Sequence, residues 1–350
     1  MAELSLPAPP ASRGFGLTPW LLIALGLASA LSLSVGAAGL GPLRLIAAAQ
    51  GEGLSLPEAV VLYDIRLPRL AMGLLVGAAL GLSGALLQGL FRNPLADPGI
   101  VGVGAGAGLG AVLAIVLGGL LPPAVLARAG GHLVPLAACL GGWLFTVVLY
   151  RVASSRGRTQ VATLLLAGIA LGALAGGMTG VLIYLADGSQ LRDLTFWSMG
   201  SLAGSTWTKL LAVLPLIGMV LVLAPRLGRG LNALALGEAQ AAHMGIDVQR
   251  LKRLTVLATA LATGAAVAVS GGIGFVGIVV PHLLRLANGP DHRRLLPQAA
   301  MLGAMLLVLA DLVSRQIVAP AELPIGIITA LLGAPVFLWI LLRQAGLQRG

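Results

Sequence analysis

Charged residues are scarce in this 350-residue chain, and acidic residues are the scarcest. Asp, Glu, Lys and Arg together make up 10% of the sequence, whereas hydrophobic residues make up 58%. A soluble protein of this length needs a polar surface around its core, and this composition cannot supply both. Lipid must cover most of the surface, so the chain is predicted to be an integral membrane protein.

The sequence also lacks the residues of most catalytic and metal centres. Cys139 is its only cysteine, which excludes an intrachain disulfide and a cysteine metal cluster and favours a buried thiol. Neither HExxH nor a P-loop occurs, so the chain cannot bind ATP through that loop. The glycines of Gly272 to Gly277 fit a dinucleotide pattern, but they join two apolar stretches. We expect no catalytic or metal residue, and we interpret His282 as structural.

Long apolar runs fill the chain instead. A membrane span needs about 20 apolar residues to cross about 30 Å of hydrocarbon. We therefore predict an all-α membrane protein of about ten spans, at residues 20–41, 67–91, 97–118, 133–150, 161–185, 209–225, 253–270, 273–289, 295–314 and 324–342. The stretch 190–203 is shorter and contains Arg192 and Asp193, which predicts a partial helix dipping from one face.

The basic residues indicate an orientation. They are scattered between the spans, which argues against a nucleic-acid surface despite the net charge of +10. With the N-terminus inside, 15 of the 22 Lys and Arg residues fall in inner segments. The positive-inside rule then places both termini in the cytoplasm, with residues 1–19 as a leader, 20–343 as the membrane domain and 344–350 as a tail.

Small residues and a sequence repeat suggest how the spans pack. Glycines four residues apart lie in one groove of a helix, which predicts a central, tightly packed span carrying Gly168, Gly172, Gly176 and Gly180. The segment from Arg66 to Gly84 is echoed by the segment from Arg250 to Gly271, and the two run in opposite directions in the predicted topology. Such an inverted repeat is common among transport proteins.

One polar segment, residues 236–247, stands apart from the apolar runs. Gly237 and Gly245 bracket a predicted short helix that carries Glu238, Gln240 and His243 on a water-facing surface. The segment is too polar for lipid and too short to fold alone, so it is either a docking surface or a solvated loop. Elsewhere, Asp311 and Arg315 have the spacing of a helical ion pair, and we found no carboxylate pattern typical of an ion relay.

Several motifs follow one another from about residue 60 onward. They are Arg66-Leu-Pro-Arg69, Gly77-Ala-Ala-Leu-Gly-Leu-Ser-Gly84, Arg92-Asn-Pro-Leu-Ala-Asp-Pro-Gly99, Phe196-Trp-Ser-Met-Gly200, Gly274-Phe-Val-Gly-Ile-Val-Val-Pro-His282 and Ala321-Glu-Leu-Pro-Ile-Gly326. In this order they closely resemble FecCD-type permeases, the membrane subunits of ABC importers for ferric siderophores, haem and cobalamin. The resemblance implies a multi-pass inner-membrane subunit that forms a homodimer, with the pathway between the two copies.

The resemblance also implies partners and residue roles. Two separate ATPase subunits would use ATP and Mg on the cytoplasmic side and contact the segment 236–247 through Gly237, Glu238, Gln240, His243 and Gly245. A periplasmic binding protein would dock on Arg66, Arg69 and Arg315, for which lipid-headgroup anchoring is the alternative. The pathway would narrow at Asn93, Leu95, Val161 and Ala162, although the last two are less polar than in some relatives.

The cargo implied by the resemblance is an iron chelate or a corrinoid. Haem is favoured because Phe91-Arg-Asn-Pro-Leu-Ala-Asp-Pro98 is most similar to the haem-uptake branch, and a ferric siderophore or cobalamin is the alternative. An ion-coupled secondary transporter is a more distant alternative that would need buried acids and no partner. An intramembrane enzyme is a further alternative that would need a set of catalytic residues, and we find none in the sequence.

Overall fold

Ten apolar helices dominate the computed structural model, which describes residues 16–36, 41–155, 158–319 and 321–347. Eight helical segments in this part are long and apolar enough to cross a membrane, and two shorter apolar helices, α14 and α16, join them. The expected all-α fold is thereby confirmed, and eight long and two shorter apolar helices agree approximately with the expected ten spans. In chain order the ten are α1 (Leu17–Ser34), α4 (Leu67–Phe91), α5 (Val103–Leu117), α7 (Leu133–Ala153), α8 (Val161–Leu185), α10 (Trp207–Leu223), α13 (Val248–Ser270), α14 (Val276–Asn288), α15 (His292–Ile317) and α16 (Ile325–Leu347).

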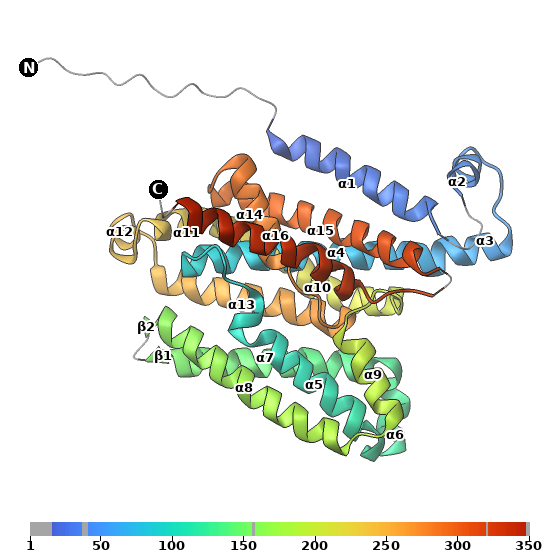
Figure 1. Cartoon of the computed structure of the whole chain (residues 1–350), viewed down its shortest axis with the longest axis horizontal. Coiled ribbons are helices and arrows are strands. Elements are labelled where there is room, and N and C mark those ends of the chain that lie inside the picture. The colour runs from blue at the N-terminus through green and yellow to red at the C-terminus, as the bar shows by residue number, and fades with distance from the viewer. Residues whose placement is uncertain (1–15, 37–40, 156–157, 320, 348–350) are drawn as a thin grey trace, which may run out of the picture.

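Short elements gather at the two ends of this bundle (Figure 1). One end, called the α3 end below, holds α2 (Pro42–Ala49), α3 (Leu56–Val60), α6 (Pro123–Ala129) and α9 (Gly188–Ser198). The other, called the α12 end, holds α11 (Gly228–Ala235), α12 (Glu238–His243) and a hairpin of β1 (Ser154–Ser155) and β2 (Arg158–Thr159). Helix α9 is the partial helix predicted at 190–203.

The second span is longer than predicted. Helix α3, the π-helix η1 (Val61–Arg66) and α4 form one helical run over residues 56–91. Its start is fixed by a capping box, in which Ser55 and Glu58 satisfy each other's backbone N–H groups. At about 1.5 Å per residue the run measures about 54 Å, well beyond a hydrocarbon core of about 30 Å. It therefore carries its first turns out past the other helices at the α3 end.

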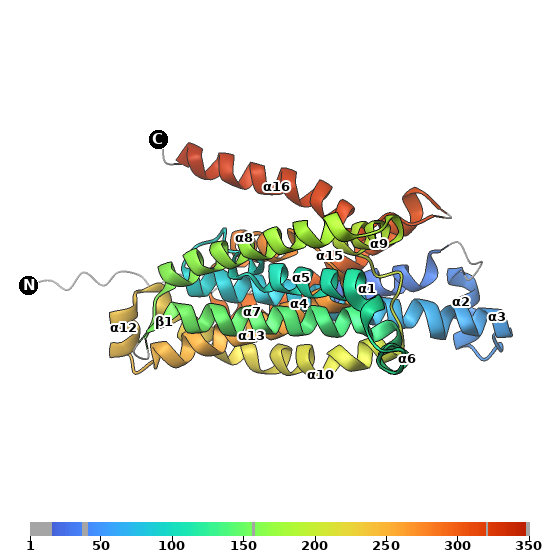
Figure 2. The ribbon, with the colours of Figure 1, turned by 90° about the horizontal axis from the view of Figure 1, so that it is seen from below.

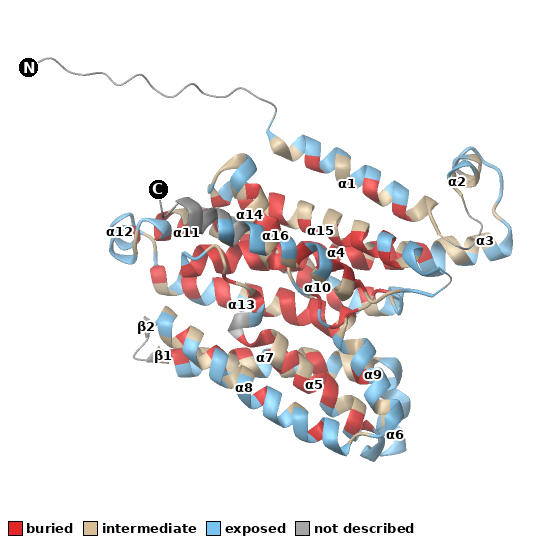
Figure 3. Ribbon diagram, in the orientation of Figure 1, coloured by how far each residue is buried: buried red, intermediate tan, exposed pale blue. Residues whose placement is uncertain are grey.

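Helix α4 is the centre of the fold, and 83% of its most apolar window is buried (Figure 3). It packs against α13, α14 and α15. Its glycines make this possible, because a Cβ at Gly77, Gly81 or Gly84 would collide with the backbone of Gly303, Ala299 or Gly277 respectively. Close backbone approach is the usual way in which helices associate in lipid.

Helices α4 and α13 carry the two copies of the sequence echo. They lie side by side and run in opposite directions, α4 toward the α12 end and α13 away from it (Figures 1 and 2). This is the antiparallel relation that the inverted repeat predicted.

Helix α8, in contrast, corrects a prediction. Only 17% of its most apolar window is buried, and a Cβ at Gly172, Gly176 or Gly180 would meet nothing within 4 Å. Gly168 alone of the four glycines is buried. The prediction of a central, tightly packed span is wrong within one chain, because the glycines of α8 face open space instead of a neighbouring helix.

Candidate functional site

The polar segment folds as predicted from its two glycines. Helix α12 begins after Gly237, whose φ of +119° favours glycine, and the turn after it contains Gly245 at a φ of +80°. Glu238, Gln240 and His243 are all exposed on this helix. Ala241 is fully buried and anchors the helix to the main core. Helix α12, at one end of the bundle in Figure 1, therefore exposes polar side chains on one face and packs against the core through Ala241 on the other.

A buried lysine joins this helix to the neighbouring hairpin. The ammonium of Lys252 lies 2.8 Å from the Glu238 carboxylate and donates a hydrogen bond of 2.9 Å to the carbonyl of Thr159. The amide side chain of Gln249 accepts a hydrogen bond of 2.9 Å from the N–H of Thr159. Side chains of α13 thus hold both backbone groups of the last hairpin residue.

The predicted gate residues lie in two segments. Val161 and Ala162 form the first turn of α8, directly after the hairpin, and Ala162 is exposed. Asn93 and Leu95 lie in the turn that follows α4, where the Asn93 side chain accepts a hydrogen bond of 3.0 Å from the N–H of Leu95. Asn93 is exposed and Leu95 is half-buried.

The chain between α4 and α5 stays non-helical until the 3-10 helix η2 (Pro98–Val101), which packs against α5 and α8. Helix α4 ends at Phe91, and the next residue, Arg92, has a left-handed φ of +52°. The carboxylate of Asp97 accepts a hydrogen bond of 2.8 Å from the N–H of Gly99 and so begins η2. The segment after η2 lies near Gly168 of α8, about two turns beyond Val161 and Ala162, so both predicted gate segments are next to elements that pack together.

Two of the three predicted docking arginines, Arg69 and Arg315, share the Asp311 carboxylate at the α3 end, while Arg66 joins Arg315 at the end of α1. Arg69 binds Asp311 with two of its nitrogens, at 2.9 and 3.1 Å, and Glu322 with a third at 2.7 Å. Arg315 lies 3.2 Å from the same Asp311, which confirms the predicted ion pair within α15. Arg66 donates to the carbonyl of Leu33 at the end of α1.

These arginines are turned inward in the single chain. Arg66 and Arg69 are 5% and 8% exposed, and the Arg315 side chain is 10% exposed. Glu322 is the accessible member, with 37% of its side chain exposed. The cluster therefore carries one net positive charge from three arginines and two carboxylates, but its guanidinium groups are already engaged. Docking of a partner on them stays a prediction that requires an exchange of carboxylates.

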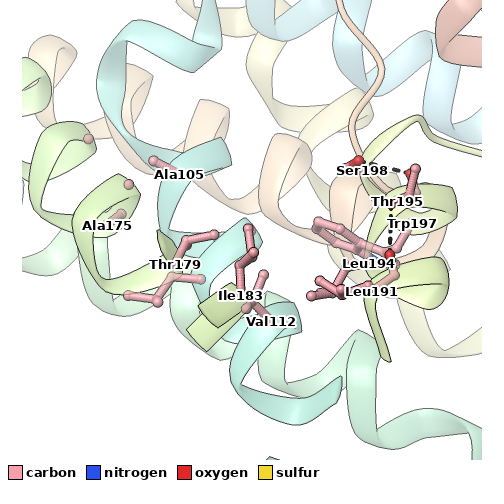
Figure 4. Close-up of a pocket in the computed structure, with 14 residues that line it drawn as sticks. Ala105, Val112, Ala175, Thr179, Ile183, Leu191, Leu194, Thr195, Trp197 and Ser198 are labelled. Carbon is pink, nitrogen blue, oxygen red and sulfur yellow. Dashed lines mark hydrogen bonds between the residues drawn. The ribbon is translucent and has the colours of Figure 1, made fainter. Parts of the chain in front are cut away.

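A cavity of about 420 Å³ opens between α5, α8 and α9 (Figure 4). Two of its hydroxyls are bonded locally, since those of Thr195 and Ser198 donate to the carbonyls of Leu191 and Thr195 at 2.7 and 2.9 Å. Apart from Thr179 and the Trp197 indole, the rest of the lining is small or apolar and includes Gly172 and Gly176 of α8. None of the side chains that line this cavity is charged.

Metal-ligating groups do not converge in the described ranges, where no set of three His, Cys, Asp or Glu side chains is placed to hold an ion. His282 and Cys139 are both half-buried. The glycine-rich stretch that ends at Gly277 connects α13 to α14, as expected from its position between two apolar runs. Sequence reasoning missed Lys252, which it counted only as one of the inner basic residues.

Comparison with known proteins gives a consistent result. The FecCD transport family profile matches residues 21–343. The hemin transport system permease protein HmuU of Yersinia pestis is 47% identical over 287 residues, which cover 82% of this chain and 84% of that protein. The vitamin B12 import system permease protein BtuC of Klebsiella pneumoniae is 42% identical over 336 residues, covering 95% and 94%.

A solved structure shares the whole architecture. It is a metal-chelate type ABC transporter in an inward-facing conformation, with a TM-score of 0.81 and 32% sequence identity over 93% of this chain and 99% of that one. PsaBC from Streptococcus pneumoniae, at a TM-score of 0.54 and 17% identity, shares the fold alone.

Proposed function

This chain belongs to the FecCD transport family and is a permease subunit of an ABC importer, and we propose that its cargo is haem. The observation that carries the choice of haem is the 47% identity to a hemin permease, against 42% to vitamin B12 permeases. A ferric siderophore or cobalamin is the alternative cargo. The smooth lining of the cavity beside α8 suits a bulky chelate, whose selection is then left to the binding protein.

The empty glycine face of α8 supports a functional homodimer. A Cβ at Gly172, Gly176 or Gly180 would meet nothing within 4 Å in this chain, although such glycines normally allow close helix approach. Exposed apolar side chains flank them, among them Ile169, Leu174 and Val181. A second copy is the partner that would cover this face and enclose the cavity as a central pathway.

Helix α12 is the proposed contact with a separate ATPase. The chain has no P-loop, so the energy must come from another subunit or from an ion gradient. Helix α12 presents Glu238, Gln240 and His243 to water at the end of the molecule where the gate segments also lie. We assign this end to the cytoplasm of a bacterial inner membrane, with the binding protein at the α3 end.

An ion-coupled transporter fits the structure less well. A relay needs carboxylates that can exchange protons or ions inside the membrane. Asp311, the acid near the end of α15, is held by two arginines within 3.2 Å. Between Leu67 and the end of α10 the acidic residues are Asp97, which caps η2, and Asp187 and Asp193 at α9.

The test is uptake into proteoliposomes that contain this subunit, its ATPase and its binding protein. Haem, a ferric siderophore and cobalamin are offered separately, each with ATP, with a non-hydrolysable analogue and with an ionophore. We expect haem uptake that requires hydrolysis and resists the ionophore. Uptake of another chelate would replace the proposed cargo and retain the importer. Uptake driven by an ion gradient without ATP would overturn the assignment.

A further inference from the structure

Lys252 is a charged side chain in a place where charge is costly. Its side chain is 3% exposed, and Glu238 is the carboxylate within ion-pair distance in the described part of the chain. Burying an ammonium group is unfavourable unless ion pairing and hydrogen bonds compensate for the lost water. Two such contacts are present, the Glu238 carboxylate at 2.8 Å and the Thr159 carbonyl at 2.9 Å.

The contact with Thr159 fixes the start of α8. Thr159 is the last residue of β2, and its N–H and carbonyl are both held by α13, through Gln249 and Lys252. The next residue, Gln160, donates its N–H to the carbonyl of Ala153 at 3.1 Å, which closes the hairpin onto α7. Val161 then begins α8. The hairpin and the first turn of α8 are therefore tied to the first turns of α13.

The contact with Glu238 reaches the water-facing surface. Glu238 is the first residue of α12, and 45% of its side chain is exposed. One oxygen of this carboxylate contacts the buried ammonium while the rest of the group faces solvent. The Lys252 ammonium thus connects α12 to the backbone that precedes Val161 through two contacts, one with Glu238 and one with Thr159. A movement of α12 can be transmitted through them.

We propose that Lys252 is a positioning residue of the transport cycle, which holds the gate segment at the start of α8 to α12 so that movement of α12 opens or closes it. The proposal rests on the proposed function, because it assumes that an ATPase moves α12. A purely structural lysine would stabilise the fold without affecting how much cargo moves per ATP. The two roles therefore differ in the amount of cargo taken up per ATP hydrolysed, which can be measured.

The experiment compares Lys252→Met, Lys252→Arg and Glu238→Gln in the reconstituted complex. Methionine keeps much of the length of the lysine stem and removes the charge, while arginine keeps the charge. Arg253→Met is the matched control, because it removes a cation from the next, exposed position of the same helix. Uptake and ATP hydrolysis are measured on the same vesicles, and thermal stability is measured in detergent.

A second readout follows the gate itself. Ala162→Cys in a Cys139→Ser background places a single thiol on the exposed first turn of α8. Its reaction rate with a charged thiol reagent is recorded with and without ATP. In the wild-type background we expect a rate that depends on ATP.

We expect Lys252→Met to lower uptake per ATP by about tenfold, a typical size for coupling between sites, and to abolish the ATP dependence of labelling at position 162. Lys252→Arg should restore part of both, and Arg253→Met should change neither. Glu238→Gln should lower the ratio, and adding it to Lys252→Met should lower it no further, since both remove the same link.

An unchanged ratio and unchanged labelling in Lys252→Met would overturn the proposal. Should that variant not fold, an unchanged ratio in Glu238→Gln would overturn it instead. Failure of the wild-type complex to take up any chelate with ATP would refute the proposed function itself, which is a different result.

Discussion

Glu322 is the accessible residue of the arginine cluster at the α3 end. It binds Arg69 at 2.7 Å, so a carboxylate arriving from a binding protein must compete with it. We predict that Glu322→Gln tightens binding of the periplasmic partner by about twofold to fivefold, the equivalent of one partly exposed ion pair. Surface plasmon resonance on nanodisc-embedded protein measures this affinity.

The control for that measurement is Glu52→Gln. Glu52 also pairs with an arginine, Arg44 at 3.3 Å, but it lies outside the cluster and 71% of its side chain is exposed. The affinity of the Glu52→Gln variant for the binding protein should equal that of the wild type. Unchanged affinity in Glu322→Gln would count against docking on Arg69 and favour the anchoring role that was the alternative.

Asp291 makes stability depend on pH. Hydrogen bonds from the Asn232 side chain and the Arg293 N–H to its carboxylate hold the pKa below its usual range. A carboxyl with a lowered folded pKa stabilises the protein above its unfolded pKa of about 3.9, and this contribution is lost as pH falls through the folded value. Asp291→Asn should therefore lower Tm at pH 7 and approach the wild-type Tm as pH falls below about 4.

A Tm series in detergent from pH 7 to pH 3 tests this convergence. Asp247→Asn is the matched control, since Asp247 also caps a helix by accepting a hydrogen bond from the Arg250 N–H at 2.9 Å. A difference between Asp291→Asn and the wild type that stays constant down to pH 3 would contradict the expectation.

Helices α4 and α8 use glycine for opposite purposes. Gly81 of α4 faces the backbone of Ala299 with no room for a side chain, while Gly176 of α8 faces open space. We predict that Gly81→Leu prevents folding, whereas Gly176→Leu leaves the fold of each chain intact and abolishes the dimer. Native mass spectrometry and thermal stability separate the two outcomes.

Gly218→Leu is the control, because Gly218 of α10 also faces open space but lies on a different helix. It should change neither stability nor oligomeric state. A dimeric Gly176→Leu protein would show that α8 does not form the interface.

The same contrast explains what the sequence could predict at the level of elements. Apolar length located the ten spans, because a span is set by the bilayer and needs no knowledge of its neighbours. The position of α8 could not be derived in this way, because a glycine stripe is the same whether its partner is in the chain or in another copy. The first turns of the second span were missed because Tyr63, Asp64 and Arg66 interrupt its apolar run.

Lys252 illustrates the same limit for the candidate site. Val248, Leu251, Lys252, Thr255 and Val256 are all buried and share one face of α13 at helical spacing, a pattern that predicts burial of Lys252. Its two partners, however, come from positions 14 and 93 residues away. Periodicity could indicate a buried ammonium group, but only the fold could identify what it holds.

On the scale of the whole molecule, the two ends differ in the kind of charge they present. At the α12 end, the carboxylate and polar side chains of α12 are exposed, and Lys252 links them to the segment that precedes α8. At the α3 end, Arg69 and Arg315 are turned inward onto Asp311, and Arg66 is buried against the end of α1. This difference between the two ends fits an importer that an ATPase drives from one end and that receives its cargo at the other.

The final prediction concerns which end faces the cytoplasm. Single cysteines are introduced at exposed positions of the two ends, Gln240→Cys on α12 and Arg192→Cys on α9, in the Cys139→Ser background. A membrane-impermeant thiol reagent applied to intact spheroplasts should label position 192 and leave position 240 unlabelled. Permeabilised cells, in which both positions should react, provide the control for reactivity. Labelling of position 240 alone in intact spheroplasts would invert the topology and place α12 out of reach of ATP, so the importer assignment and the coupling role of Lys252 would fail together.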